Sequence, residues 1–244
     1  MAFHYSPNIT TNGLILYMDP ANPNSYTGTP PTQFSSGWND LTSLNSGALI
    51  GGYSYDSANL AFSVITATAT TPAWISTTNT LSFPDSSEYS MEFSVKLRAN
   101  AGVDLHSLCG NGSTNPWVGI VGSPTSWKFF FRDSTPSATY SYSATQSNYN
   151  LSQNWLNLSF TVATDRTIKF YMNGVFISNV VDINGFKPSS TLLNVNRLAG
   201  GYSSSGNSFP FQGFISATRI YNRLLTDVEI LQNYNAIKTR FRLS

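Results

Sequence analysis

The chain has 244 residues, a length at which one all-β sandwich forms a single domain, and we expect one domain. Thirteen Lys and Arg residues balance twelve Asp and Glu residues, and a net charge of +1 excludes a strong long-range field that would attract nucleic acid or anionic membranes. Only 10% of the residues are charged, but 14% are aromatic, which supplies enough apolar surface for a packed core and argues against disorder. The single cysteine, Cys109, excludes an intrachain disulfide and is expected to be a buried thiol.

The N-terminal residues carry no recognisable targeting signal. No basic region precedes an apolar stretch of roughly 7–15 residues, so no secretory signal is predicted. No apolar run approaches the roughly 20 residues that span a bilayer. We expect a protein that folds in a cytoplasm, is not secreted and has no membrane partner.

The first predicted strand follows an extended arm at residues 1–13. Leu14, Leu16 and Met18 share one face of this strand, because side chains alternate along a strand, and Asp19-Pro20 ends it. Residues 52–87 are rich in β-branched side chains and contain two prolines, which predicts two short strands and a loop.

Alternation of apolar and polar residues is clearest in the middle of the chain. Residues 91–98 alternate strictly, which predicts a half-buried strand with a polar outer face. Further strands present rows of apolar side chains, namely Trp127, Phe129 and Phe131, then Tyr140 and Tyr142, then Leu156, Leu158, Phe160 and Val162. Asn173-Gly174 predicts a type I′ hairpin that pairs Met172 with Val175, since both turn residues need positive φ.

The closing stretch changes from strand to helix. Residues 214–221 alternate as a strand, and Thr226 with Glu229 forms a capping box that starts a helix at Asp227. We expect this helix to extend to about residue 239 and to plug the sandwich by burying Leu231 and Tyr234.

Five segments of the sequence together resemble the concanavalin A-like, laminin-G-like (LamG) sandwich domains of bacteriophage virion proteins. The resemblance rests on an opening strand with an Asp turn, a Trp turn, a central Trp strand with a Tyr-x-Asn-Gly hairpin, a Gly-Gly turn, and the closing strand and helix. These segments are residues 13–26, Trp38–Leu41, Asn154–Ile177, Arg197–Gly201 and Arg219–Ala236. Residues 52–87 depart from the family pattern. The resemblance implies an all-β, two-sheet antiparallel jelly-roll sandwich over residues 14–244, with a short C-terminal helix at about 227–239.

The resemblance also implies a function. It indicates a structural protein located in the virion, displayed on the particle surface as a capsid decoration or cement protein. Its expected partners are other virion proteins, either major capsid or tail proteins, and further copies of itself. The alternative is a carbohydrate-binding protein of a tail fibre or adhesin that recognises a host surface glycan.

Glycan binding would need exposed aromatic rings beside polar groups. Residues that meet this description on the predicted strands are Trp117, Trp127, Arg132, Tyr140 and Tyr142. A sandwich of this size also buries most of its aromatic residues, so the core and a protein interface remain alternative places for each of them.

Enzymatic chemistry finds little support in the sequence, and we expect no enzyme. Glu88 and Glu92 lie four residues apart, about 13 Å on a strand, whereas glycosidases hold their carboxylates about 5–9.5 Å apart. A polysaccharide hydrolase is therefore the remote alternative. His106 is expected in a loop, and together with Asp104 and Cys109 it supplies too few ligands for zinc.

Calcium remains open, because sandwiches of this kind hold the ion at a rim with an Asp and backbone oxygens. Asp133, Asp165 and Asp182 are the loop carboxylates that could serve, although solvated turn residues are the alternative interpretation. We assign no metal ligand and expect no cofactor other than a structural calcium ion.

Overall fold

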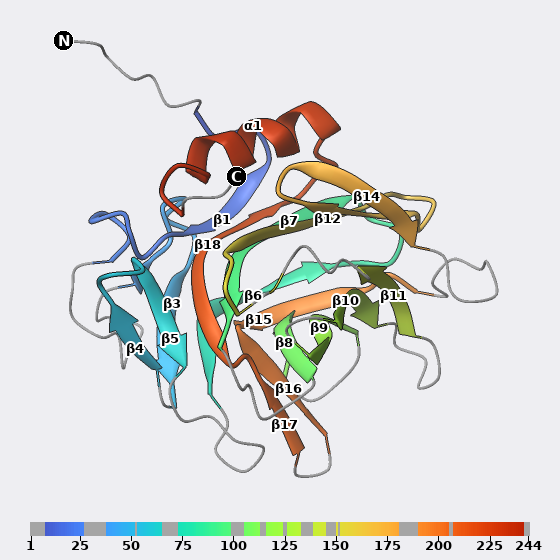
Figure 1. The fold of residues 1–244 in the computed structure, drawn as a ribbon. Helices are drawn as coiled ribbons and strands as arrows, with labels where there is room; N and C mark the ends of the chain where they lie inside the picture. The colour runs from blue at the N-terminus through green and yellow to red at the C-terminus, as the bar shows by residue number, and fades with distance from the viewer. Residues whose placement is uncertain are drawn as a thin grey trace.

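The computed structural model describes residues 8–26, 38–51, 53–64, 73–98, 105–112, 116–123, 126–132, 139–144, 150, 152–180, 190–204 and 207–241. These residues form two packed antiparallel sheets and one short helix (Figure 1). The predicted all-β sandwich with a C-terminal helix is confirmed.

The first sheet, called here the helix-side sheet, runs in the order β14-β13-β12-β7-β18-β5-β4, and β1 also pairs with β18. Its strands are β1 (Leu14–Met18), β4 (Tyr53–Asp56), β5 (Ala61–Val64), β7 (Tyr89–Leu97), β12 (Leu156–Val162), β13 (Ile168–Met172), β14 (Val175–Val180) and β18 (Gly213–Tyr221). Strands from both ends of the chain therefore meet in this sheet.

The second sheet, called here the facing sheet, runs in the order β11-β10-β9-β8-β15-β6-β3-β2. Its strands are β2 (Trp38–Asn39), β3 (Ser46–Ile50), β6 (Trp74–Phe83), β8 (Leu105–Gly110), β9 (Trp117–Ser123), β10 (Ser126–Arg132), β11 (Thr139–Ala144) and β15 (Leu193–Leu198). A two-stranded hairpin of β16 (Gly200–Ser204) and β17 (Asn207–Pro210) completes the β structure.

The core lies between the two sheets and is built by alternation. Met91, Phe93 and Val95 of β7 are fully buried with Phe129 and Phe131 of β10, as the predicted inward rows require. Cys109 belongs to the same core, and burial raises the pKa of its thiol. The cysteine is thus a buried thiol, as predicted.

Helix α1 (Asp227–Ile237) covers the outer face of the helix-side sheet (Figure 1). Ile230 packs with Tyr171 and Tyr221 of that face, and Ile237 packs with Trp155. The prediction that β7 is only half-buried is therefore wrong, although its outer face is polar as predicted. Glu92 and Ser94 on that face are fully buried, and Asn233 of α1 contacts Glu92.

A buried polar network joins α1 to the sheet beneath it. Arg219 Nε of β18 lies 3.0 Å from Glu92 Oε2 of β7, and both side chains are buried. Asn233 of α1 donates to the same Glu92 oxygen at 2.9 Å and to the Tyr221 hydroxyl at 3.0 Å. The Thr10 N–H donates to Asn233 Oδ1 at 2.7 Å, so the same side chain also holds the segment that precedes β1.

The helix ends at Ile237, two residues before its predicted end at about 239, and one of the two residues predicted to be buried is exposed. Tyr234 is buried, with 6% of its surface exposed, but Leu231 is 44% exposed. Successive helical residues are turned by about 100°, so Ile230 and Leu231 cannot both face the sheet. The buried face consists of Ile230, Asn233, Tyr234 and Ile237. The burial of the polar residue Asn233 was not predicted from the sequence.

Two further predictions are wrong. His106 lies in strand β8 and not in a loop; it is buried, and its Nδ1 accepts the Gln212 N–H at 3.3 Å. The unusual 52–87 segment contains three strands, β4, β5 and β6, and not two short ones. The third of these strands is long because its residues pair with both β3 and β15.

The predicted hairpin turn and the predicted helix start are both confirmed. Asn173 and Gly174 have φ values of 52° and 77°, and Met172 pairs with Val175. A Cβ at Gly174 would lie 2.9 Å from the Tyr234 Cβ, so the turn also packs against α1. The capping box at Thr226 and Glu229 is present, and α1 begins at Asp227.

Replacing Asn233 by leucine should destabilise the fold strongly. The change removes one buried partner each from Glu92 and Tyr221 and leaves the Thr10 N–H without its Asn233 acceptor, and we expect the free energy of unfolding in urea to fall by about 2–4 kcal/mol. The matched control is Asn235→Leu on the same helix, where the side chain is only partly buried and a change within about 0.5 kcal/mol is expected. Equal losses in the two variants would contradict this role of Asn233.

The capping box predicts a specific acid dependence. The hydrogen bonds from Arg223 are the largest cause that lowers the pKa of Glu229, and they outweigh burial, so that the pKa falls from 4.5 to about 2. A carboxyl group with a lowered folded pKa contributes stability above pH 4.5, and this contribution is lost as the pH falls toward 2. Urea unfolding of the wild type and of Glu229→Gln should therefore differ at pH 6 and converge near pH 2. A difference that stays constant with pH would refute this assignment.

Candidate ligand pocket

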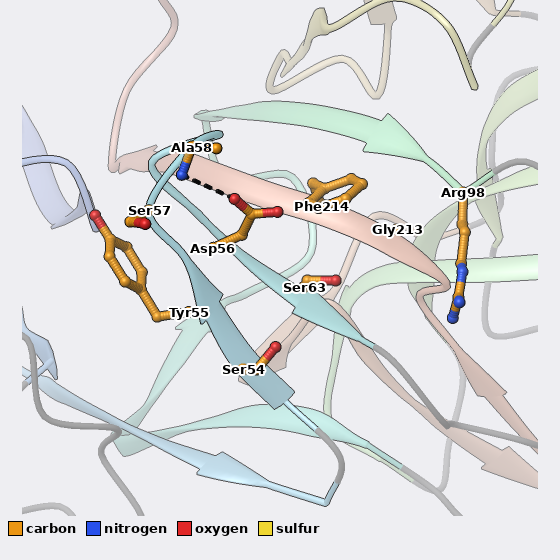
Figure 2. Close-up of a pocket in the computed structure, with 9 residues that line it drawn as sticks. All are labelled: Ser54, Tyr55, Asp56, Ser57, Ala58, Ser63, Arg98, Gly213 and Phe214. Carbon is orange, nitrogen blue, oxygen red and sulfur yellow. Dashed lines mark hydrogen bonds between the residues drawn. The ribbon is translucent and has the colours of Figure 1, made fainter.

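A cavity of about 440 Å³ opens on the outer face of the helix-side sheet, and Figure 2 shows the residues that line it. Strands β4, β5 and β18 form its floor, the β4–β5 turn lies at one end, and the residue after β7 lies at the other. The lining residues are Ser54, Tyr55, Asp56, Ser57, Ala58, Ser63, Arg98, Gly213 and Phe214.

Strand register places the floor residues in one row. Ser54 pairs with Ser63, Ser63 pairs with Phe214, and Phe214 pairs with Lys96 of β7. The next residue on β18, Ile215, is buried in the core, so alternation directs Phe214 outward. The row therefore presents hydroxyl groups, an aromatic ring and an ammonium group along the outer face of the sheet.

Phe214 is held in place by a small aromatic cluster. Its ring lies 6.3 Å from that of Trp155, which in turn lies 4.6 Å from the ring of Phe241. Phe214 itself is only partly buried, and Figure 2 shows it between the β4–β5 turn and Arg98. The cluster supports one side of the ring and leaves part of it accessible to a ligand.

Asp56 fixes the β4–β5 turn at one end of the pocket. Its Oδ1 accepts the N–H groups of Ala58 and Asn59 at 2.9 and 3.0 Å, and its Oδ2 accepts from the Asn59 side chain at 3.0 Å. Burial is the largest influence on this carboxyl and raises its pKa, but the hydrogen bonds together outweigh burial and lower the pKa. Asp56 is thus an ionised carboxylate with most of its acceptor positions already in use.

The pocket is suited to binding a polar ligand. Three serine hydroxyls can donate or accept hydrogen bonds, Arg98 adds several donors, and Phe214 adds an apolar surface. Among the described lining residues there is no histidine or cysteine that could serve as a catalytic base or nucleophile. The arrangement can hold a polar ligand through hydrogen bonds and contact with an aromatic ring.

The aromatic residues predicted from the sequence lie elsewhere, on the facing sheet. Trp117 of β9 and Trp127 of β10 are only 1% and 2% exposed; Trp117 packs edge-to-face on Phe130, and Trp127 belongs to the main core. Arg132 pairs with Trp117 across β9 and β10. Tyr140 and Tyr142 are in β11 at register positions opposite Phe131 and Phe129, and their side chains lie outside the described part. None of these five residues lines the pocket.

The acidic candidates do not form a catalytic pair in the described structure. Glu92 is buried in its ion pair with Arg219, whereas Glu88 is exposed just before β7. Burial is the main influence on Glu92 and raises its pKa, although Arg219 opposes this effect. The two carboxyl groups are thus in different environments and do not share one open surface.

The calcium candidates are also separated. Asp133 and Asp182 lie outside the described residues, and Asp165 accepts hydrogen bonds from Thr167 in its own turn. The described part of the chain contains no group of three His, Cys, Asp or Glu side chains that could hold a metal ion. It also contains no helix with the length and apolar character that a membrane span requires.

The sequence of this chain matches one protein family. Residues 68–231 match the family description "Concanavalin A-like lectin/glucanases superfamily" of laminin G type, which covers well over half of the chain. No curated protein matches the sequence.

Several solved structures share the fold at low sequence identity. Domain 4 of AbnA, an extracellular arabinanase from Geobacillus stearothermophilus in complex with arabinotriose, is 18% identical, with a TM-score of 0.55 over 92% of this chain and 100% of that one. The binding domain of Paraclostridial Mosquitocidal Protein 1 is 15% identical, with a TM-score of 0.59 over 92% of this chain and 52% of that one. The ligand binding domain of botulinum neurotoxin serotype D, in complex with N-acetylneuraminic acid, is 12% identical, with a TM-score of 0.57 over 91% of this chain and 50% of that one.

This chain spans about half the length of the two toxin domains, and at these identities the similarity shows the fold alone. The family match covers most of both sheets and the first half of α1. The chain belongs to the concanavalin A-like lectin/glucanase superfamily.

Proposed function

We propose that this chain is a carbohydrate-binding module that recognises a glycan in the pocket on the outer face of the helix-side sheet. The observation that carries the proposal is the partly exposed Phe214 ring in a row with Ser54 and Ser63. The C–H face of a sugar ring stacks on an aromatic ring, while its hydroxyl groups need nearby hydrogen-bonding partners. The pocket supplies both within about 440 Å³, a volume within the range of small-molecule sites.

The structural neighbours support the same function. The arabinanase domain was solved with arabinotriose and the neurotoxin domain with N-acetylneuraminic acid, so the fold is compatible with sugar recognition in other proteins. Fold alone does not assign a function, and the lining residues of this chain carry the argument. We also propose that the module binds its glycan without hydrolysing it, since Glu92 is buried under α1.

Replacing Phe214 by alanine tests the site. We expect calorimetry to show at least about tenfold weaker binding, or roughly 1.4 kcal/mol, for the strongest ligands found on a glycan array. Arabinotriose and sialyllactose would be the first soluble probes. The matched control is Phe176→Ala, because Phe176 is 44% exposed at the sheet edge, away from the pocket, and its loss should leave affinity unchanged. Equal weakening in both variants, or a blank glycan array, would refute the proposal.

A second function, display on a bacteriophage particle, is supported by a different surface. Val175 and Phe176 of β14 and Val228 and Leu231 of α1 are all large apolar side chains with substantial exposure. These residues lie on two contacting elements, and exposed apolar patches of this kind occur at protein interfaces. In this hypothesis the module is a decoration protein that attaches to capsid or tail subunits through the patch.

Replacing Leu231 by aspartate tests this attachment. A buried charge in the interface should remove most of the module from purified virions of the phage that encodes it, measured as copies per particle by quantitative electrophoresis. Leu44→Asp is the matched control, since Leu44 is 58% exposed on a different surface. A wild type present at only a few copies per particle, or equal loss of both variants, would contradict a decoration role.

A further inference from the structure

The pocket carries positive charge along one of its walls. Lys96 of β7 and Arg98, the residue that follows the strand, point to the same side of the sheet, because Leu97 between them is buried in the core. Lys96 pairs directly with Phe214, and Arg98 lines the cavity (Figure 2). Arg98 thus lines the pocket, and Lys96 occupies the register position opposite the aromatic residue on which a sugar would stack.

The carboxylate of Asp56 lies at the opposite corner of the pocket. Strands β4 and β7 are three strand spacings apart, roughly 14 Å, and they run antiparallel to each other. Ser54 and Lys96 lie in the same row across the sheet. Asp56 lies two residues beyond Ser54, and Arg98 lies two residues beyond Lys96. Because the two strands run in opposite directions, these two displacements add to roughly 13 Å along the strands. Ideal strand geometry thus puts their Cα atoms roughly 19 Å apart. Figure 2 shows the two residues at opposite ends of the pocket.

Asp56 therefore lies at the other end of the pocket from the cationic side chains. Asp56 is also engaged by three hydrogen bonds within its own turn. A ligand in the pocket therefore meets a positive end at β7 and a hydroxyl-rich, acceptor-bearing end at the β4–β5 turn.

We propose that the pocket selects acidic glycans, with a sugar carboxylate directed toward Arg98 and Lys96 and the sugar ring placed on Phe214. This inference rests on the proposed carbohydrate-binding function and adds the class of sugar. A guanidinium group presents paired N–H donors that match a carboxylate, and Lys96 adds a second positive charge beside the ring. Uronic acids and nonulosonic acids both carry the required carboxylate. The neutral remainder of the oligosaccharide extends toward Ser54 and Asp56.

Trigalacturonate and its fully methyl-esterified form test this selection, because they share rings and linkages and differ in charge. Sialyllactose and lactose form a second pair. In calorimetry at 50 mM salt, we expect each acidic ligand to bind about tenfold more tightly than its uncharged partner. The preference should shrink at 500 mM salt, since surface electrostatic attraction is screened.

Arg98→Ala should remove most of this preference, because the acidic ligand should lose several-fold more affinity than its uncharged partner. Lys128→Ala is the matched control, because Lys128 is an exposed cation on β10 of the facing sheet and should not affect either ligand. Equal affinity for acidic and uncharged ligands would overturn the inference and leave the proposed function intact. Binding of neither form, with a blank glycan array, would overturn both. Displacement of the acidic sugars by equimolar sulfate would also overturn the inference, since it would indicate a general anion site.

Discussion

The fold depends on one buried ion pair and the amide that completes it. Arg219 and Glu92 lie on neighbouring strands of the helix-side sheet, on its outer face, where a solvated polar surface is expected. They are buried because α1 lies over them, and Asn233 of α1 shares the Glu92 oxygen. A buried ion pair adds little net stability by itself, but leaving one member without its partner is costly, so the network strongly favours one position of the helix.

The position of the helix in turn defines the pocket. Ile237 and Phe241, at the end of the helix and just beyond it, pack on Trp155, and this cluster reaches the ring of Phe214. The outer face of the sheet is thereby divided into a part that is covered by α1 and a part on β4, β5 and β18 that remains open. The open part carries the aromatic ring, the serine hydroxyls and the positive wall that we assign to ligand binding.

Much of the fold was predictable from the sequence because the relevant signals are local. The Asn173-Gly174 turn and the Thr226–Glu229 capping box each require particular residues at fixed spacing, and both were located correctly. The inward rows of β7 and β10 follow from alternation alone. The burial of Glu92 and the exposure of Leu231 depend instead on where α1 docks, which is a tertiary property that local patterns do not contain.

The pocket was not predictable for a related reason. Ser54, Phe214 and Arg98 come from distant segments and become neighbours only through the β4-β5-β18-β7 strand order. In the sequence, outward-facing Ser and Arg residues look like ordinary solvated positions, whereas Trp117 and Trp127 are more conspicuous as binding residues. Large indole rings contribute much apolar surface to a core. Trp127 is buried in the main core, and Trp117 is buried in a smaller cluster with Phe130. The outward position of Phe214 within an alternating strand was the one available signal, and it became informative only when its neighbours were known.

The most direct test of the account is a titration of the isotope-labelled protein with trigalacturonate, followed by backbone NMR chemical shifts. The account predicts that shift changes concentrate on residues 54–63, 96–98 and 213–214, and that β9, β10 and β11 of the facing sheet stay unaffected. Shift changes centred on Trp117 and Arg132, or the absence of any saturable change, would contradict the central claim that this pocket is a glycan-binding site.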